Sequence, residues 1–397
     1  MTYGYLIDPA SQDAEDLRNL VAPAPYLGQV ATRSMIPGAF LSTSKQMMSR
    51  TVHIARDDIT SLTFLFPNWH CASGLGEQGS GAALNLWASL EYPLGSTPQR
   101  IYFSGASSVS IANLATATSD AVSISIPRNS PFAVKSYYTN SAGIIYSLGR
   151  NQVSGDPFLE GYIAAASGVT DNTLTTTNPS ASVVAYGPCA IIGTTTRASV
   201  FFAGDSRVVG AGESAASQDP IGSKGLFERA IGKEFAFINA AASGDRVETA
   251  LAGYARRLAL AQYCSHVVSN YGINDIIVGR TAAQVLADLS SFGALFGTKP
   301  ISQATLDPAT DSTDTWATTA NQSKKGYEQV RLDVNRGIRR VPAPYQRMFD
   351  VADVMETSRD SGIWNPLYTG DGLHASSLGG LKLEQSRAID LRSFLRS

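Results

Sequence analysis

Side chains suited to chemistry occur in four short segments of this chain, each placed after an apolar run or in a glycine-containing loop. The first segment is Gly204-Asp205-Ser206, which follows the strand-like run 199–203. A strand that stops on a glycine turn can present a hydroxyl at the sheet edge where open α/β sheets place their ligands. Ser206 is therefore a candidate nucleophile, although Gly, Asp and Ser are also common turn residues.

The other three segments supply groups that a serine nucleophile needs. They are Ser243-Gly244-Asp245, Gly272-Ile273-Asn274-Asp275 and Asp371-Gly372-Leu373-His374. Serine alone is a weak nucleophile and requires a base within hydrogen-bond reach. A hydroxyl, a glycine amide, a carboxamide, an imidazole and a carboxylate together make up the inventory for acyl transfer through serine.

The elements that must bring these segments together follow from the pattern after residue 198, where short apolar strands alternate with segments of helical length. We expect strands at 199–203, 235–239, 265–270, 299–305 and 347–351, and helices at 220–231, 247–262, 282–296, 324–340 and 378–395. Asp219 followed by Pro220 is a helix start signal. The alternation predicts a parallel sheet covered on both faces, with all strand carboxyl ends at one edge.

Residues 1–195 show a different pattern, so we place a domain boundary near 195 and a second domain over 196–397. Residues 1–45 are punctuated by Pro and Gly and predict an irregular segment, with room for one short helix over 13–20. Beyond about 48, apolar residues alternate in strand-like runs near 62–66, 84–92, 122–126, 132–138, 143–146, 183–186 and 190–192. Such runs predict a β-sandwich of the jelly-roll kind, with the Thr/Ser/Asn-rich stretch 167–182 as a loop or edge.

Composition narrows the class of protein. A chain of 397 residues with 44% hydrophobic and 16% charged residues is typical of a globular protein of about two domains. The formal net charge of -2 predicts no nucleic-acid or membrane partner. We see no signal peptide or membrane span, and expect a cytoplasmic protein or a secreted one whose leader was removed. The separated Cys71, Cys189 and Cys264 are expected to be buried thiols, not a disulfide framework or a metal cluster.

In their order along the chain, the four segments resemble the motifs of the SGNH (GDSL-type) hydrolases. The resemblance covers roughly residues 198–397 and implies a flavodoxin-like, three-layer α/β/α fold that hydrolyses esters without a metal or other cofactor. The matching positions are Ser206 for the nucleophile, Gly244 and Asn274 for the oxyanion hole, and Asp371 and His374 for the acid and base. Ala241 stands where many relatives have a glycine, which is a departure from the family pattern.

These residue types also have physical roles of their own. We expect His374 to take the Ser206 proton during attack and to return it to the leaving alcohol. Asp371 would accept the other ring N–H and favour the imidazolium. The backbone amides of Ser206 and Gly244 and the Asn274 side chain would stabilise the oxygen of the tetrahedral intermediate. A glycine at 244 would avoid crowding the acyl carbon.

Other polar residues at the same edge have two interpretations. Asp205 and Asp275 are expected to brace their loops through hydrogen bonds to backbone amides. Arg207, Asp275 and Trp316 are also candidate substrate-binding residues, the last in the long loop 305–322. The remaining histidines, His53, His70 and His266, are expected to be structural, with groove lining as the alternative for His70.

The sequence thus predicts a serine esterase for short acyl groups, with acetyl on a carbohydrate as the first hypothesis. The carbohydrate part depends on the β-rich module before the catalytic domain, an arrangement similar to some polysaccharide deacetylases of the family. Four aromatic residues are candidates for stacking on sugars or, equally, for filling the core: Trp69, Trp87, Tyr137 and Tyr138. The alternatives are a lipase or arylesterase, a metal-dependent hydrolase using Asp205, Asn274, Asp371 and His374, and a non-catalytic binding protein. The expected partner is a small-molecule or glycan ester, and the sequence indicates no oligomeric state.

Overall fold

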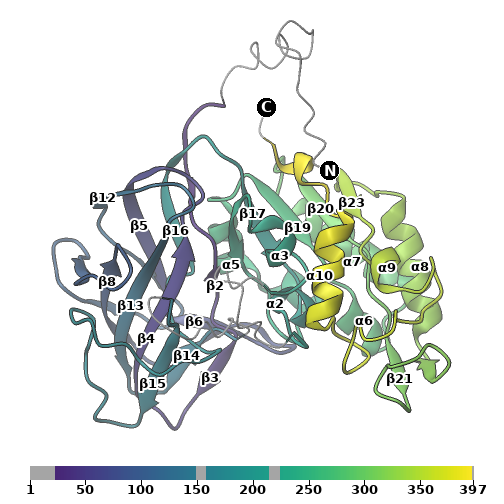
Figure 1. Ribbon diagram of the computed structural model, residues 1–397, viewed down its shortest axis with the longest axis horizontal. Helices are drawn as coiled ribbons and strands as arrows, with labels where there is room; N and C mark the ends of the chain where they lie inside the picture. Colours follow the sequence, from purple (N-terminus) through teal and green to yellow (C-terminus); the bar gives the residue numbers. More distant parts are fainter. Residues whose placement is uncertain (1–22, 149–157, 214–223, 396–397) are drawn as a thin grey trace, which may run out of the picture.

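The computed structural model describes residues 23–148, 158–213 and 224–395. The antiparallel strands of the N-terminal half, purple to teal in Figure 1, lie beside a parallel sheet with helices, green to yellow. We call the described residues up to 195 the N-terminal half and the later ones the C-terminal half. The domain boundary near 195 stays a prediction, and the expected helix over 13–20 and helix start at Asp219-Pro220 lie outside the described residues.

The C-terminal half is built on a six-stranded parallel sheet in the order β2-β18-β17-β19-β20-β23. The strands are β2 (Ser34–Met35), β17 (Ser199–Ala203), β18 (Ala236–Asn239), β19 (His266–Ser269), β20 (Ile301–Ala304) and β23 (Arg347–Phe349). The five strands predicted after residue 198 are all present. Without β2 their order along the chain is 2-1-3-4-5, the doubly wound order whose switch point lies beside the first strand, here β17.

Helices cover both faces of this sheet. They are α2 (Ser206–Val209), α3 (Glu228–Ile231), α4 (Val247–Ala252), α5 (Ala255–Ala261), α6 (Ile273–Ile277), α7 (Ala282–Ala294), α8 (Glu328–Arg339), α9 (Ala352–Met355), α10 (Ser377–Ser386) and the 3-10 turn η1 (Leu391–Phe394). Successive residues of β17 enter different cores: Phe201 packs with α4, α5, α7 and α8, whereas Phe202 packs with α3, α9 and α10. The two-sided burial explains why these strands read as continuous apolar runs.

Four expected helices differ in extent. Of the helix predicted over 220–231, the described part is helical only in α3, since residues 224–227 form no helix. The prediction of one helix over 247–262 is wrong. Helix α4 ends before Gly253, and a separate helix, α5, begins at Ala255. The helix predicted from 324 begins at Glu328, because residues 322–324 form strand β22. The last helix ends at Ser386, where Arg387 takes a left-handed conformation with φ of 57°.

The N-terminal half contains two antiparallel sheets, ordered β1-β16-β5-β11 with β12 on β5, and β10-β8-β13-β4-β15 with β9 on β8. The strands are β1 (Tyr26–Gln29), β4 (Gln46–Ile54), β5 (Ile59–Pro67), β8 (Leu84–Glu91), β9 (Gln99–Ile101), β10 (Val109–Ile111), β11 (Thr116–Thr118), β12 (Val122–Ile126), β13 (Pro131–Asn140), β15 (Gly161–Ala165) and β16 (Ala190–Thr195). Phe64 of β5 and Val134 of β13 belong to one buried cluster, so the sheets share a core. The jelly-roll connectivity stays a prediction.

Two expectations for this half are wrong. Residues 183–186 form no strand, since only isolated bridges at Ala181 and Ala185 occur there. The segment expected to be irregular over 1–45 contains β1, β2 and β3 (Ala39–Leu41) in its described part. Because β2 pairs with β18, this early segment contributes an edge strand to the parallel sheet of the other half.

Three two-stranded ribbons complete the description: β14 (Ile144–Tyr146) with β3, β6 (Trp69–Ala72) with β7 (Gly76–Gly79), and β21 (Thr310–Ser312) with β22 (Gln322–Lys324). Trp69 of β6 is fully buried in the cluster that also contains Phe201 of β17. The two halves therefore share apolar packing, and the β6–β7 hairpin lies at their junction.

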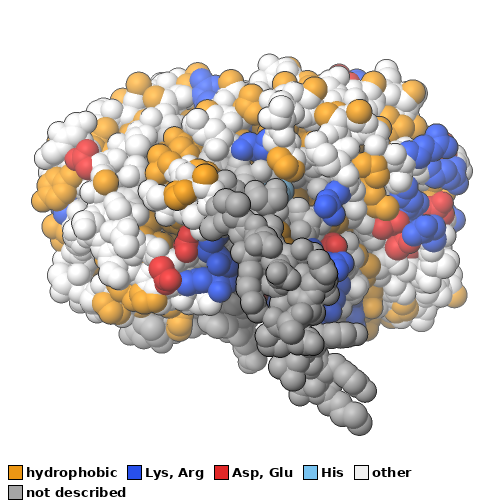
Figure 2. Space-filling view, turned by 90° about the horizontal axis from the view of Figure 1, so that it is seen from above, with side chains coloured by type: hydrophobic (Ala, Val, Ile, Leu, Met, Phe, Trp, Pro, Cys, Tyr) orange, Lys and Arg blue, Asp and Glu red, His pale blue; other side chains and the backbone are white. Residues whose placement is uncertain are grey.

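The surface mixes charges of both signs. Figure 2 shows blue Lys and Arg side chains next to red Asp and Glu side chains at the right-hand edge of the view. In the described ranges, no helix combines the length and the apolar character that crossing a membrane would require.

Candidate active site

Ser206 lies where β17 meets helix α2. Asp205 caps the helix, because its Oδ1 accepts the backbone N–H of Arg207 at 3.0 Å. Ser206 is the first helical residue and is 9% exposed. A Cβ atom at position 204 would lie 2.6 Å from the Val208 side chain, so glycine allows the tight turn that presents the hydroxyl.

The structure brings Ser206, His374 and Asp371 together. His374 Nε2 lies 2.8 Å from Ser206 Oγ, and its Nδ1 lies 2.7 Å from Asp371 Oδ2. Burial alone would raise the pKa of Asp371, but hydrogen bonds from the His374 ring and from two backbone amides hold that pKa well below its usual range. An ionised carboxylate beside Nδ1 favours the tautomer whose Nε2 can accept a proton from the serine.

The loop that carries Asp371 and His374 is held from several sides. Asp371 Oδ1 accepts the backbone N–H groups of Leu373 at 2.9 Å and His374 at 2.8 Å. Thr369 Oγ1 donates to the His374 carbonyl at 2.7 Å. Gly372 has φ of 74°, and a Cβ there would lie 2.6 Å from the Trp316 ring. The histidine is therefore held in place by its own loop as well as by the carboxylate.

Gly244 and Asn274 lie on adjacent loops. Asn274 Nδ2 donates to the carbonyl of Asp245, the residue after Gly244, at 3.0 Å. Gly244 has φ of 73°, and a Cβ there would lie 1.9 Å from Ser73 Oγ. The need for glycine thus has a cause that the sequence did not reveal, since the obstructing side chain comes from the N-terminal half. The oxyanion role of both residues stays a prediction.

Two of the candidate substrate-binding residues are buried and have structural partners. Arg207 donates through Nε to the Leu373 carbonyl at 3.1 Å and through Nη2 to the Pro308 carbonyl at 3.3 Å. Asp275 accepts the backbone N–H groups of Val247 at 3.0 Å and Glu248 at 3.2 Å. These bonds agree with the bracing role expected for Asp275, and substrate binding by Arg207 and Asp275 stays a prediction.

Trp316 is half-buried and lies against the loop of His374. Its Nε1 donates to Thr310 Oγ1 at 2.9 Å, and its ring contacts Gly372. Its position beside this loop is compatible with a wall of the site, and its role in substrate binding stays a prediction.

The other histidines are buried away from this constellation. His53 is bonded to Thr51 and to the Thr32 carbonyl, and His266 lies beside Ser265. His70 stacks on Phe40 with ring centroids 5.6 Å apart, and burial lowers the pKa of its ring. These placements agree with the expected structural roles.

No group of three or more His, Cys, Asp or Glu side chains in the described part of the chain is arranged to hold a metal ion. Of the residues considered as an alternative metal site, His374 has both ring nitrogens bonded, to Ser206 and to Asp371. Cys71, Cys189 and Cys264 are buried free thiols.

Sequence reasoning missed Asp307, a buried carboxylate that lies beneath the site. Its two carboxylate oxygens have no hydrogen-bond partner among the described residues. Burial raises the pKa of Asp307, while nearby Arg207 opposes that rise. The available signal was its position directly after the fourth strand of the sheet, at the edge where the four segments meet.

Comparisons with known proteins gave matches among solved structures only. No protein-family model matches the chain, and no curated protein matches it. About half of the chain is similar in structure to a lipase/acylhydrolase from Enterococcus faecalis, with 21% identity over 50% of this chain and 97% of that chain and a TM-score of 0.36.

Two further matches have comparable values. A variant of an acetyl xylan esterase from Geobacillus stearothermophilus shows 18% identity over 51% of this chain and 99% of that chain, with a TM-score of 0.35. A GDSL-like lipase from Bacteroides thetaiotaomicron shows 17% identity over 48% of this chain and 87% of that chain, with a TM-score of 0.35.

Proposed function

We propose that the protein is a serine ester hydrolase of the SGNH type, with Ser206 as nucleophile, His374 as base and Asp371 as the orienting acid. The observation that supports this most directly is the hydrogen-bonded series from Ser206 Oγ to His374 Nε2 at 2.8 Å and from His374 Nδ1 to Asp371 Oδ2 at 2.7 Å. A nucleophile, a base and an orienting group in contact form the arrangement that serine acyl transfer requires.

The proposed reaction proceeds in two steps. Ser206 Oγ attacks the ester carbonyl carbon while His374 Nε2 takes the hydroxyl proton, and the ionised Asp371 stabilises the imidazolium. Collapse of the tetrahedral intermediate passes that proton to the leaving alcohol and leaves an acyl-serine. Water, activated by the same histidine, then attacks the acyl-serine and releases the acid.

The negative oxygen of the intermediate would bind between two loops. Ser206 begins a helix, where the first backbone N–H groups lack an intrahelical acceptor. The second amide hydrogen of Asn274 is available because only one of its two is needed for the bond to the Asp245 carbonyl. Together with the Gly244 N–H, these donors would form the oxyanion hole.

The substrate is proposed to be an ester of a short acyl group, with an acetylated carbohydrate as its most specific form. A small pocket with mostly apolar walls lies beside α2, and its lining includes neither Ser206 nor His374. It is lined by Met35, Ile36, Gly38, Leu148, Val209, Ala241, Ala242 and Ser243. Of the aromatic residues considered for sugar stacking, Trp69 and Tyr138 are buried in the core, whereas Trp87 and Tyr137 are half-buried with ring centroids 5.6 Å apart.

Hydrolysis of p-nitrophenyl acetate by wild type and Ser206→Ala tests this function. We expect Ser206→Ala to lower kcat by at least about 10³-fold, since loss of a triad nucleophile removes covalent catalysis. The matched control is Ser291→Ala, on the exposed face of α7, which should keep wild-type activity. A Ser206→Ala protein as active as the control would exclude Ser206 as nucleophile. Rising activity from acetyl to octanoyl esters would favour the lipase alternative.

A further inference from the structure

The β6–β7 hairpin of the N-terminal half lies against the loop that carries Gly244. We propose that this hairpin positions the oxyanion hole, with Glu77 acting through Arg257 and Asp245 on Asn274. The inference deepens the proposed function and rests on it, because the oxyanion role of Asn274 belongs to that function.

The tip of the hairpin contacts the loop directly. Ser73, in the turn between β6 and β7, has its Oγ so close to Gly244 that a Cβ at 244 would lie 1.9 Å away. Further along, a Cβ at Gly76 would lie 3.4 Å from Thr249 of α4. The hairpin thus covers the segment that runs from Gly244 into α4.

Glu77 anchors the hairpin at the start of α5. Its Oε1 accepts the backbone N–H of Arg257 at 2.8 Å, and its Oε2 accepts the backbone N–H of Arg256 at 3.0 Å. The Glu77 side chain is 2% exposed. A helix start leaves its first N–H groups without intrahelical partners, so a carboxylate from another part of the chain can cap α5. This cap accompanies the new helix start after Gly253.

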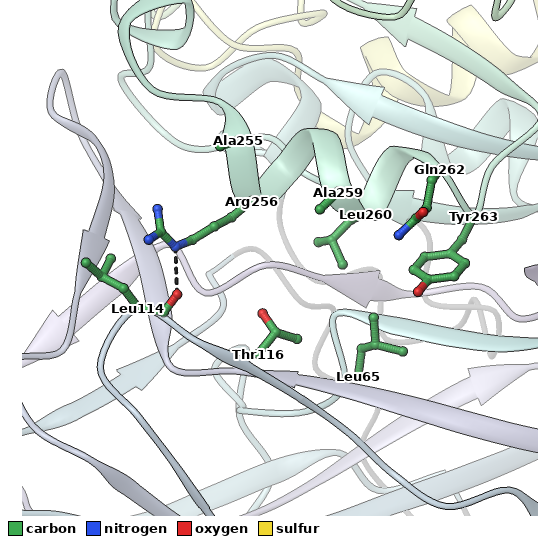
Figure 3. Close-up of a pocket in the computed structure, with 9 residues that line it drawn as sticks. All are labelled: Leu65, Leu114, Thr116, Ala255, Arg256, Ala259, Leu260, Gln262 and Tyr263. Atoms are coloured by element: carbon green, nitrogen blue, oxygen red, sulfur yellow. Dashed lines mark hydrogen bonds between the residues drawn. The ribbon is translucent and has the colours of Figure 1, made fainter.

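The side chain of Arg256 strengthens the same junction. Its Nη1 lies 3.3 Å from Glu77 Oε2. Figure 3 shows its guanidinium reaching from α5 toward the N-terminal half, where Nε donates to the Leu114 carbonyl at 2.7 Å. The helix is therefore tied to two separate places in the other half.

Arg257 connects Glu77 of the hairpin to Asp245 in the interior. Its guanidinium is fully buried, with Nε 3.5 Å from Glu77 Oε1 and Nη1 2.5 Å from Asp245 Oδ2. Tyr271 donates its hydroxyl to the same Asp245 oxygen at 2.6 Å, and the Arg257 guanidinium lies 4.1 Å from the centre of the Tyr254 ring. A buried charge that loses its partner strongly destabilises the protein. The positions of Glu77, Arg257 and Asp245 are therefore expected to depend on one another.

Asp245 connects the buried Arg257 to the Asn274 side chain. Its side chain is held by Arg257 and Tyr271, and its backbone carbonyl accepts Asn274 Nδ2 at 3.0 Å. That bond fixes the plane of the Asn274 amide and hence the direction of its second N–H. Gly244, the other proposed donor on these loops, is the residue directly before Asp245. Both donors would therefore move if Asp245 moved.

Glu77 is the group in this series that comes from the N-terminal half, so it allows a direct test. In Glu77→Gln, Arg257 keeps one of its two acid partners and is expected to shift, which carries Asp245 and Asn274 with it. A misplacement of about 1 Å at an active site costs up to about 10²-fold in rate. We expect kcat for p-nitrophenyl acetate to fall about tenfold, with KM within about threefold of wild type.

The control is Glu234→Gln. Glu234 pairs with Arg128 at 3.2 Å across the junction of the two halves, but the pair is exposed and lies at the opposite end of the sheet. The same change in charge should therefore leave kcat and KM unchanged. If Glu77→Gln also has wild-type kcat while Ser206→Ala is inactive, the inference is overturned and the proposed function stands.

A double-mutant cycle separates positioning from loss of general stability. In the Asn274→Ala background one of the two donors that Glu77 is proposed to position is absent and only Gly244 can still be displaced, so Glu77→Gln should lower kcat by clearly less than tenfold. A full tenfold loss in that background would show that Glu77 does not act through Asn274 and would overturn the inference.

The hairpin tip provides a second variant that does not disturb buried charge. Ser73 is exposed, so Ser73→Val should fold normally, yet its added methyl group would press on Gly244. We expect kcat to fall severalfold with the melting temperature unchanged, and Ser73→Ala to keep wild-type kcat. If Glu77→Gln does not fold, wild-type kcat in Ser73→Val would overturn the inference by itself.

Discussion

Two groups of buried charges, one in each half, differ in how completely their polar atoms are hydrogen-bonded. The sheet cluster of the N-terminal half consists of Arg50, Glu91 and Lys135 on the central strands β4, β8 and β13. Arg50 binds Glu91 through two bonds, at 2.6 Å and 2.9 Å, and Lys135 Nζ lies 3.8 Å from Glu91.

Lys135 also donates to the Thr175 carbonyl at 2.6 Å and the Thr177 carbonyl at 3.1 Å. The Thr-rich loop expected over 167–182 is thus a cover for charged groups.

The site cluster of the C-terminal half consists of Asp205, Arg207 and Asp307, beneath Ser206 and His374. Asp205 Oδ2, Arg207 Nη1 and both carboxylate oxygens of Asp307 have no hydrogen-bond partner among the described residues. Burial raises the pKa of Asp205 to about 6, although nearby Arg207 opposes the rise. In the sheet cluster the pKa of Glu91 is instead lowered, because bonds from Arg50 and Gly95 outweigh the effect of burial.

The difference indicates what each cluster does. Buried polar groups are normally paired, and unpaired atoms close to a nucleophile and its base mark a candidate functional site. We therefore expect changes near the site cluster to lower activity more than stability. Changes in the sheet cluster should do the reverse.

The largest expected effect is on activity, from His374→Ala. Loss of the base should lower kcat for p-nitrophenyl acetate by about 10⁶-fold, as for other triad residues that act as a unit. Asp371→Asn should cost less, about 10⁴-fold, because the loop bonds made by Thr369 and the backbone still hold the histidine. Melting curves should be close to wild type for both variants. Equal losses of kcat would show that orientation by the loop is unimportant.

The largest expected effect on stability comes from Glu91→Ala in the sheet cluster. Arg50 and Lys135 would lose their buried counter-charge, so the free energy of unfolding should fall by about 3–5 kcal/mol. Urea denaturation measures this loss, and kcat of the folded fraction should be unchanged. Glu234→Ala removes an exposed partner of Arg128 and should cost less than about 1 kcal/mol. Similar losses in the two variants would contradict the structural role of the sheet cluster.

The smallest expected effect concerns pH, through Asp205→Asn. A folded-state pKa of about 6, above the usual value of 3.8, means that the folded protein binds this proton more tightly than the unfolded chain. Ionisation of Asp205 therefore lowers the free energy of unfolding as pH rises from about 4 to about 6, and this effect is constant above that range. The carboxamide of the variant does not titrate, so the variant should gain about 2 kcal/mol relative to wild type between about pH 4.5 and about pH 7.5.

Urea denaturation of both proteins at the two pH values measures this difference. The amide oxygen of asparagine can still accept the backbone N–H of Arg207, so the cap of α2 is expected to remain. A stability difference that does not vary with pH would show that Asp205 has an ordinary pKa.

The elements of the parallel sheet could be predicted because apolar runs end at residues with distinct chemistry. Ser206, Asn274 and His374 follow such runs or lie in glycine-containing loops, and parallel topology brings those places to one edge. The central strand β4 was missed because both of its faces are buried and it carries Arg50, so it shows no alternation.

The contribution of the hairpin to the site could not be predicted. Glu77 and its partner Arg256 are 179 positions apart, and neither neighbourhood has a pattern that points to the other. The helix predicted over 247–262 was broken at Gly253 for a related reason, since the N–H groups at the start of α5 find their acceptor in the other half. Contacts of this kind are fixed by tertiary packing and leave no periodic signal in the sequence.

The short edge strand β2 also has a consequence for the order of events during synthesis. Ser34 and Met35 pair with Ile238 and Asn239, which the ribosome adds about 200 residues later. At ordinary rates of translation this is an interval of roughly 10 to 40 s. During that time the antiparallel sheets can form around a stretch of chain whose partner does not yet exist. The N-terminal half therefore has to keep this stretch accessible until the second half arrives to complete the sheet.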